Sequence, residues 1–232
     1  KLVEQACKIL VVSHKQPDAD TLGAAIACKL WLNEWGKEVT LACVDRIGER
    51  FLFLPYVQDF VREFKLEDFD LLIVVDAGAS HMTNFQLKYP NFLKSGIPII
   101  NIDHHASNDL YGTVNVVDPQ APSATVIIYR MLKYFGVNIS SDMASVLLAG
   151  IYGDTGSFMH SNTTLEVYEI AADLLAKGAK ISYVSRNLFH RDKASTLRLW
   201  GTALERAKLT GDQVVMSVVR KEDYEKLQAR PE

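Results

Sequence analysis

Short apolar runs alternate with segments of helical periodicity along most of the chain. Continuous apolar runs predict strands that are buried on both faces, and they occupy residues 8–13, 39–44, 70–76 and 97–102. Apolar positions three and four residues apart predict helices at residues 21–35, 123–135, 142–151 and 163–177. This alternation, without tight hairpins, predicts an α/β fold built on a mainly parallel, doubly wound sheet.

The pattern changes near residue 190. After the helix at residues 163–177, two more helical stretches are expected at residues 182–189 and 193–208, followed by a turn at Gly211-Asp212 and a strand at residues 213–219. We therefore expect one domain over residues 1–190, and a helical linker with the start of a second α/β domain over residues 191–232. The chain begins at Lys1 and ends soon after this new pattern starts, so we expect a piece of a longer protein.

Composition and charge narrow the class of protein. Hydrophobic residues make up 48% and charged residues 23% of the chain, as in ordinary globular proteins. The formal net charge of −3 gives no reason to expect long DNA or an anionic membrane surface as a partner. Apolar stretches such as residues 146–151 are far shorter than the roughly 20 residues that span a bilayer, and no signal peptide is expected. Cys7, Cys28 and Cys43 are odd in number and lack a C-x-x-C spacing, which favours a reducing cytoplasm.

Acidic residues and histidines gather where the predicted elements end. Three strands and one helix are followed by such residues: His14, Asp18 and Asp20; Asp76; Asp103, His104 and His105; and Asp154. The middle group lies in the stretch IINIDHHASN, residues 99–108. In open parallel sheets the loops at the carboxyl ends of the strands bind ligands, so we expect these side chains to meet.

Each of these residues also has a structural explanation when it is taken alone. Asp20 is a good N-cap for the helix that follows it, and Asp76 and Asp154 suit turns. A single histidine is more often a hydrogen-bonded structural residue than a metal ligand. Taken together, so many buried acids need compensating cations, and a mixed set of oxygen and nitrogen ligands suits manganese. Because there are more candidate ligands than one ion needs, we expect two divalent ions about 4 Å apart, bridged by one carboxylate.

The same residues lie in four motifs that resemble those of a known family. SHKQPDAD, VVDAG, NIDHH and GIYGDTGSF resemble, in order and spacing, the signature motifs of the DHH phosphoesterases over residues 8–190. Residues 191–232 resemble the linker and the opening of the family's DHH-associated C-terminal domain. Met159 departs from the family pattern, because many members carry a basic residue just beyond the phenylalanine; His160 follows it here.

The resemblance implies a role for each candidate. Two ions would be held by these residues: His14, Asp18 and Asp76 at one ion, and Asp20, Asp76, His104 and Asp154 at the other. Asp103 would orient the histidines, and His105 would contact the phosphate or protonate the leaving oxygen. Asn108 is a weaker candidate for phosphate contact. The resemblance thus implies a catalytic group made of Asp76, Asp103 and His105.

The resemblance also implies a reaction. We expect a metal-dependent phosphohydrolase that cleaves phosphoester bonds of short oligoribonucleotides or of adenosine 3′,5′-bisphosphate with water activated by two metal ions. Manganese is the first candidate for both ions, followed by magnesium and cobalt. A cyclic-dinucleotide phosphodiesterase, a DHH-type inorganic pyrophosphatase and an inactive metal-binding regulatory domain stay open. The expected partner is a short oligonucleotide or a small phosphorylated nucleotide in the cytoplasm, with no membrane, and a homodimer stays open.

Overall fold

The chain divides into two compact units, Lys1–Leu188 and Phe189–Glu232. The computed structural model describes residues 1–189 and 194–229 of them. The linker expected near residue 190 and the start of the helix expected at residue 193 lie outside the described residues. The assignment of residues 191–232 to a second domain therefore stays a prediction, and each unit is described by itself.

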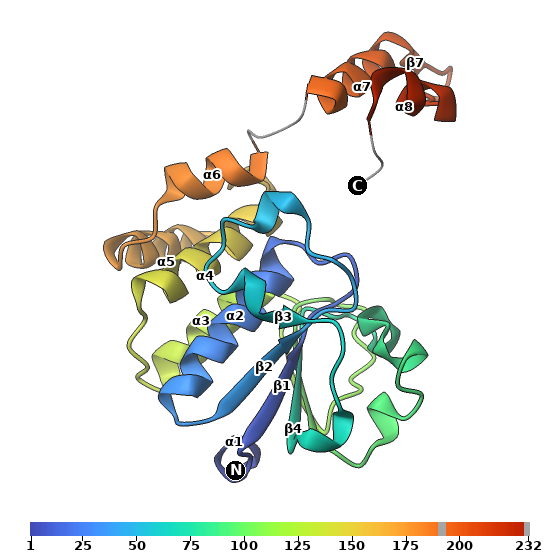
Figure 1. Ribbon diagram of the computed structural model, residues 1–232. Helices are drawn as coiled ribbons and strands as arrows, with labels where there is room; N and C mark the ends of the chain where they lie inside the picture. The colour runs from blue at the N-terminus through green and yellow to red at the C-terminus, as the bar shows by residue number, and fades with distance from the viewer. Residues whose placement is uncertain (190–193, 230–232) are drawn as a thin grey trace. The chain divides into compact units, whose positions relative to one another are not determined.

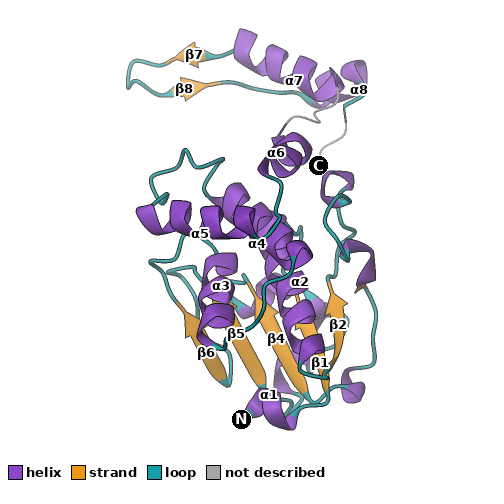
Figure 2. Cartoon of the chain, turned by 90° about the vertical axis from the view of Figure 1, so that its left-hand side faces the viewer, coloured by secondary structure: helices purple, strands orange, loops and turns teal. Residues whose placement is uncertain are grey.

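A parallel sheet of six strands lies at the centre of the first unit. The strands are β1 (Lys8–Val12), β2 (Glu38–Ala42), β3 (Phe60–Val61), β4 (Leu71–Val75), β5 (Ile99–Asp103) and β6 (Val114–Val117). Their order across the sheet is β3-β2-β1-β4-β5-β6, and every pairing is parallel (Figure 2). The α/β class predicted from the alternating pattern is confirmed. The chain runs outward from β1 in one direction and from β4 in the other, so the switch point where ligands bind in such sheets lies between these two strands.

Helices cover one face of this sheet, and short 3₁₀ turns cover the other (Figure 1). The helices of the unit are α1 (Leu2–Gln5), α2 (Ala19–Glu34), α3 (Ala124–Tyr134), α4 (Ser141–Asp154), α5 (Leu165–Ala176) and α6 (Ile181–Phe189). Alternate residues of β1 explain the two layers: Ile9 and Val11 pack with the helices, whereas Leu10 and Val12 pack with Phe85 and Phe92 of the 3₁₀ turns. Both faces of the central strands are therefore buried, as their continuous apolar runs predicted.

Two strands of the sheet were not predicted. β3 has two residues, and β6 is a four-residue edge strand whose first two side chains are exposed. Neither offers a continuous apolar run or a sustained alternation, which are the signals that sequence analysis uses. Their pairing with neighbouring strands depends on the rest of the sheet.

The second unit contains a hairpin between two helices. Its elements are α7 (Ala194–Glu205), β7 (Lys208–Leu209), β8 (Val215–Met216) and α8 (Lys221–Leu227). β7 and β8 pair antiparallel, so the Gly211-Asp212 turn lies between two strands as expected, although β8 is much shorter than residues 213–219. The helix α8 was not predicted.

Candidate metal centre

The predicted ligands come from the ends of four elements at one edge of the sheet. His14 follows β1, Asp76 follows β4, His104 follows β5, and Asp154 is the last residue of α4. Three overlapping groups bring one ligand atom from each member within 4.8 Å of the others: His14, Asp18 and Asp76; Asp76, His104 and His105; and Asp20, His104 and Asp154. Residues separated by as many as 140 positions thus meet beside the switch point of the sheet.

Asp76 lies at the centre of this cluster. It is 2% exposed, and its backbone has a φ of 54°, in the left-handed region. Its Oδ2 is 3.4 Å from His14 Nε2, and its Oδ1 is 3.4 Å from His104 Nε2. Within the described part of the chain, Oδ1 accepts no hydrogen bond. A buried carboxylate oxygen without a donor is unfavourable by about 1–3 kcal/mol or more, and a cation placed between the imidazoles would compensate it.

His14 points its Nε2 at two carboxylates. Its Nδ1 is 2.6 Å from the carbonyl oxygen of Lys15, which can only accept, so Nδ1 carries the proton. Nε2 then faces Asp76 at 3.4 Å and Asp18 at 3.8 Å. Burial disfavours a charged His14, but hydrogen bonding and attraction to Asp18 and Asp76 outweigh burial and raise its pKa to about 11. The position therefore attracts a positive charge, either a proton or a metal ion.

The same excess of negative charge acts on His104 and Asp154. His104 Nε2 is 3.3 Å from Asp154 Oδ2. Burial lowers the pKa of His104, but Asp76, Asp20 and Asp154 outweigh it and raise this pKa to about 9. Burial and the nearby charges of Asp20, Asp18 and Asp76 raise the pKa of Asp154 to about 9. The residues present thus fit divalent cations, because cations would relieve the repulsion that otherwise keeps protons on this cluster.

The carboxylate of Asp20, which is a residue of α2, accepts hydrogen bonds from the first residues of α3. It is fully buried, its Oδ2 accepts from Ala124 N at 2.6 Å, and its Oδ1 accepts from Thr125 N at 3.0 Å. The alternative prediction that Asp20 is the N-cap of α2 is wrong. The N-cap is Asp18, whose Oδ1 accepts hydrogen bonds from the backbone amides of Asp20 and Thr21 at 2.9 and 3.0 Å. Asp20 instead ties the start of α2 to the start of α3 while remaining within the third ligand group.

Asp103 and Asn108 hold His105 beside the cluster. Asp103 is fully buried, and its Oδ1 lies 2.8 Å from His105 Nδ1, while its Oδ2 accepts from Asn108 Nδ2 at 2.5 Å. The hydrogen bond to Asp103 raises the pKa of His105. His105 keeps 40% of its side chain exposed, so its Nε2 is the nitrogen available to a ligand. Asn108 Oδ1 also accepts from Leu110 N at 2.8 Å, and the carboxamide is thus engaged by the protein itself. A phosphate contact by Asn108 stays a prediction.

Sequence analysis missed Asn101. This asparagine is fully buried within β5 and donates to Asn108 Oδ1 at 2.9 Å. The signal that could have identified it is its position, since it is a polar residue between Ile100 and Ile102 in an otherwise apolar run.

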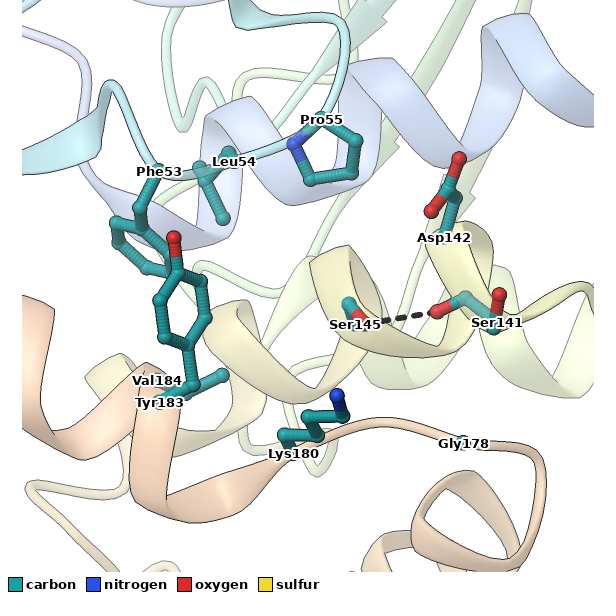
Figure 3. Close-up of a pocket in the computed structure, with 10 residues that line it drawn as sticks. All are labelled: Phe53, Leu54, Pro55, Ser141, Asp142, Ser145, Gly178, Lys180, Tyr183 and Val184. Atoms are coloured by element: carbon teal, nitrogen blue, oxygen red, sulfur yellow. Dashed lines mark hydrogen bonds between the residues drawn. The ribbon is translucent and has the colours of Figure 1, made fainter.

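A cavity of about 330 Å³ lies elsewhere in the unit (Figure 3). It is lined by Phe53, Leu54, Pro55, Ser141, Asp142, Ser145, Gly178, Lys180, Tyr183 and Val184, none of which is a predicted site residue. In its lining, Phe53 and Tyr183 pack edge to face with ring centroids 5.7 Å apart. Ser141, in the lining, begins the 14-residue helix α4 and Asp154, in the cluster, ends it, so these two residues lie about 20 Å apart along the helix. The cluster is therefore the candidate site.

No helix in the described part of the chain is long and apolar enough to cross a membrane.

The fold and the cluster define a class of protein: a parallel α/β domain that gathers carboxylates and imidazoles at its switch point to hold divalent cations. Residues 8–151 match the model of the DHH family, N-terminal domain, and the chain belongs to this family. The resemblance to the DHH family is thereby confirmed.

Curated relatives carry two kinds of name. A Thermus thermophilus protein named bifunctional oligoribonuclease and PAP phosphatase NrnA is 31% identical over 84% of this chain, and a Bacillus subtilis protein of the same name is 28% identical over 94%. A Streptococcus agalactiae protein named probable manganese-dependent inorganic pyrophosphatase is 27% identical over 97% of the chain. The chain spans 58%, 68% and 75% of the length of these three proteins, respectively.

A solved structure has the same fold. The crystal structure of an exopolyphosphatase-related protein from Bacteroides fragilis aligns with a TM-score of 0.91 and 24% identity. The alignment covers 98% of this chain and 69% of that one.

Proposed function

We propose that this chain belongs to a divalent-metal-dependent phosphohydrolase that acts on short oligoribonucleotides and on adenosine 3′,5′-bisphosphate. The observation that carries the proposal is the buried Oδ1 of Asp76, which lacks a hydrogen-bond donor among the described residues and lies beside the imidazoles of His104 and His105 at the end of β5. The names of the Thermus thermophilus and Bacillus subtilis relatives support the substrate class.

The ligand groups suggest how two ions would be shared. His14, Asp18 and Asp76 form one group, and a second set consists of Asp20, Asp76, His104 and Asp154. Asp76 is the member common to both, and its two oxygens face different histidines. Bound ions of this kind supply water activated near neutral pH and neutralise charge that develops on phosphoryl oxygens. The mixture of carboxylate and imidazole ligands supports manganese before magnesium or cobalt, as does the name of the Streptococcus agalactiae relative.

His105 is the proposed general acid. Its Nδ1 donates to the buried Asp103, so Nε2 is directed away from that carboxylate and is accessible. A protonated Nε2 would donate its proton to the oxygen that leaves the phosphorus atom. Asp103 would keep the ring oriented during that transfer and favour the imidazolium form, because its carboxylate lies 2.8 Å from Nδ1.

The test offers the purified protein a panel of substrates in the presence of manganese. A short oligoribonucleotide, adenosine 3′,5′-bisphosphate, a cyclic dinucleotide and pyrophosphate are followed in parallel through release of phosphate or mononucleotide. The matched control is Asp76→Asn, which keeps the shape of the side chain and removes its charge. Metal-dependent turnover of the first two substrates, lost in Asp76→Asn, is the expected result.

Other outcomes would replace the proposed reaction. Turnover of pyrophosphate alone would make the chain a pyrophosphatase, which its similarity to the Streptococcus agalactiae protein over 97% of the chain favours as the second candidate. Turnover of the cyclic dinucleotide alone would indicate a cyclic-dinucleotide phosphodiesterase. Binding of metal without turnover of any substrate would indicate a regulatory metal-binding domain.

Two properties of the protein belong to the same proposal. We infer a cytoplasmic location, which the three free cysteines support, since thiols persist in reducing compartments. A homodimer is the assembly to test, and light scattering at two protein concentrations would distinguish it from a monomer.

A further inference from the structure

Asn101 is an unusual residue for the middle of a central strand. It is fully buried in β5, between Ile100 and Ile102. Burying an amide group is unfavourable unless its hydrogen bonds are satisfied. Asn101 Nδ2 donates to Asn108 Oδ1 at 2.9 Å and to Asn115 Oδ1 at 3.1 Å, so both hydrogens of the amide are used. The side chain is therefore held by partners on the segment that follows β5.

The hydrogen bonds continue from Asn108 toward the cluster. Asn108 Nδ2 donates to Asp103 Oδ2 at 2.5 Å, and it also lies 3.5 Å from Asn101 Oδ1 as part of a reciprocal amide pair. Asn108 thereby occupies one oxygen of Asp103 and leaves Oδ1 for His105 Nδ1 at 2.8 Å. A carboxylate can only accept, so this contact requires the proton of His105 to be on Nδ1. The lone pair, or a second proton, is then on Nε2.

Asn115, at the outer end of this series of hydrogen bonds, is held by the backbone of the preceding turn. Asn115 Oδ1 accepts from Gly112 N at 3.0 Å, and Asn115 Nδ2 donates to the carbonyl oxygens of Leu110 at 3.2 Å and Gly112 at 2.9 Å. A Cβ on Gly112 would lie 2.9 Å from both Asn101 Cβ and Asn115 Oδ1. The backbone at residue 112 thus approaches the amides as closely as only a glycine permits, and the turn is built around them.

We propose that Asn115, Asn101, Asn108 and Asp103 form a polar relay that holds His105 in a single tautomer with Nε2 presented to the substrate. Asn101, Asn108 and Asn115 are positioning residues in this scheme. Asn108 accordingly acts on the reaction through Asp103 instead of touching the phosphate. The catalytic consequence of the relay rests on the proposed function, whereas the tautomer of His105 does not.

The first test observes the tautomer directly. Long-range proton–nitrogen NMR of the histidine rings is recorded for the whole chain with magnesium, which is diamagnetic, and His105→Gln assigns the His105 signals. At a pH above the pKa of His105, where the ring is neutral, the wild-type protein is expected to show two widely separated ring nitrogen shifts, with Nδ1 protonated. Asn101→Leu removes both amide contacts, so the two His105 nitrogen shifts should move toward each other as the second tautomer is populated.

Two further variants make this test decisive. Asn115→Ala changes an exposed side chain and removes only the outer anchor, so it should produce a smaller shift in the same direction without affecting folding. Asn187→Leu is the matched control, because Asn187 is another buried asparagine, on α6, that makes no contact with the relay. The proposal would be overturned if the His105 nitrogen shifts of folded Asn101→Leu and of Asn115→Ala were the same as those of the wild-type protein. If Asn101→Leu does not fold, the shifts of Asn115→Ala alone decide.

Kinetics separate the relay from the proposed reaction. With the substrate that the protein turns over, Asn101→Leu should lower kcat by about 10- to 100-fold with KM unchanged, the range typical of lost outer hydrogen bonds. An unchanged kcat in a variant whose tautomer has changed would overturn the catalytic part of the proposal. A wild-type protein without turnover of any substrate contradicts the proposed function, while the NMR result still decides whether the relay exists.

Discussion

Asp76 combines three properties that a purely structural aspartate rarely has. It is buried, its backbone has a left-handed φ, and one of its oxygens accepts no hydrogen bond among the described residues. A non-glycine residue in this conformation is less stable than in an extended or helical one by about 1–3 kcal/mol, and such strain is common at functional sites. Because the unpaired oxygen lies among imidazoles, a cation bound there would interact with the oxygen and offset the free-energy cost of burying it.

We predict that metal binding to the chain depends on Asp76. Manganese at about 100 times its dissociation constant should stabilise the folded state by about 2.7 kcal/mol and raise the thermal midpoint by about 5–10 °C. Asp76→Asn should abolish most of this rise, since it removes the charge shared by both ligand groups. Asp142→Asn removes an exposed carboxylate from the opposite end of α4 and should retain the full rise. A full manganese effect in Asp76→Asn would show that the ions bind elsewhere.

The metal-free protein should lose stability as the pH rises from 6 to 9. Burial and neighbouring acids raise the pKa of Asp154 from 3.8 to about 9. Burial lowers the pKa of His104, but the neighbouring acids outweigh burial and raise this pKa from 6.5 to about 9. In this window the folded state binds more protons than the unfolded state, so raising the pH favours unfolding, by up to about 1.4 kcal/mol per pH unit for each of the two groups.

Thermal midpoints in a chelating buffer at several pH values measure this slope. Adding manganese should flatten or reverse it, because metal displaces the same protons. Asp154→Asn should reduce the slope in the metal-free state. A metal-free midpoint that is constant or rises between pH 6 and 9 would contradict the assignment of these pKa values.

At the scale of elements, the cluster depends on the close packing of α2 against α4. A Cβ on Gly150 of α4 would lie 2.5 Å from Thr125 Cγ2 and 2.7 Å from Asp20 Oδ1. A Cβ on Gly23 of α2 would lie 2.4 Å from the carbonyl oxygen of Val146. Glycines at both contacts let the helix that carries Asp20 approach the helix that ends in Asp154.

Gly150→Ala should therefore destabilise the first unit and weaken its affinity for metal. The added methyl group must displace Thr125 or Asp20, and overpacking of this kind is unfavourable by about 1–3 kcal/mol. Gly201→Ala is the control, because a Cβ there meets nothing within 4 Å and alanine favours a helix over glycine. Denaturant unfolding and manganese titration measure the two effects; unchanged metal affinity in Gly150→Ala would show that the position of Asp20 does not matter for binding.

The whole molecule should unfold in two steps. The second unit, in its described residues, exposes large apolar side chains, including Trp200 at 62% and Val215 at 67%, whereas Trp31 of the first unit is 4% exposed. Fewer buried apolar contacts give a lower local stability. Chemical denaturation should therefore show an early transition of the second unit and a later one of the first.

Manganese should shift only the later transition, because all the predicted ligands belong to Lys1–Leu188. Tryptophan fluorescence of the wild-type chain and of Trp200→Phe separates the two units. A single transition that moves as a whole with manganese would show that the units unfold together.

Local patterns in the sequence were enough to predict the central elements and the identity of the candidate ligands. The apolar runs of β1, β4 and β5 and the periodicity of α2 and α4 are local signals, and a residue that follows a parallel strand lies at the ligand-binding edge of the sheet. Those rules locate Asp76 and His104 without any knowledge of their neighbours.

Which groups face one another could be read from the folded chain but not from these local patterns. Asp20 accepts from amides about 104 positions away, and the partners of Asn101 lie in the loop after its own strand and on the neighbouring strand β6. The edge strand β6 likewise exists because it pairs with β5. Hydrogen bonds between distant segments depend on packing and register, which no local pattern encodes. The sequence therefore predicted the chemistry of the site, and the fold assigned the direction of each donor and acceptor within it.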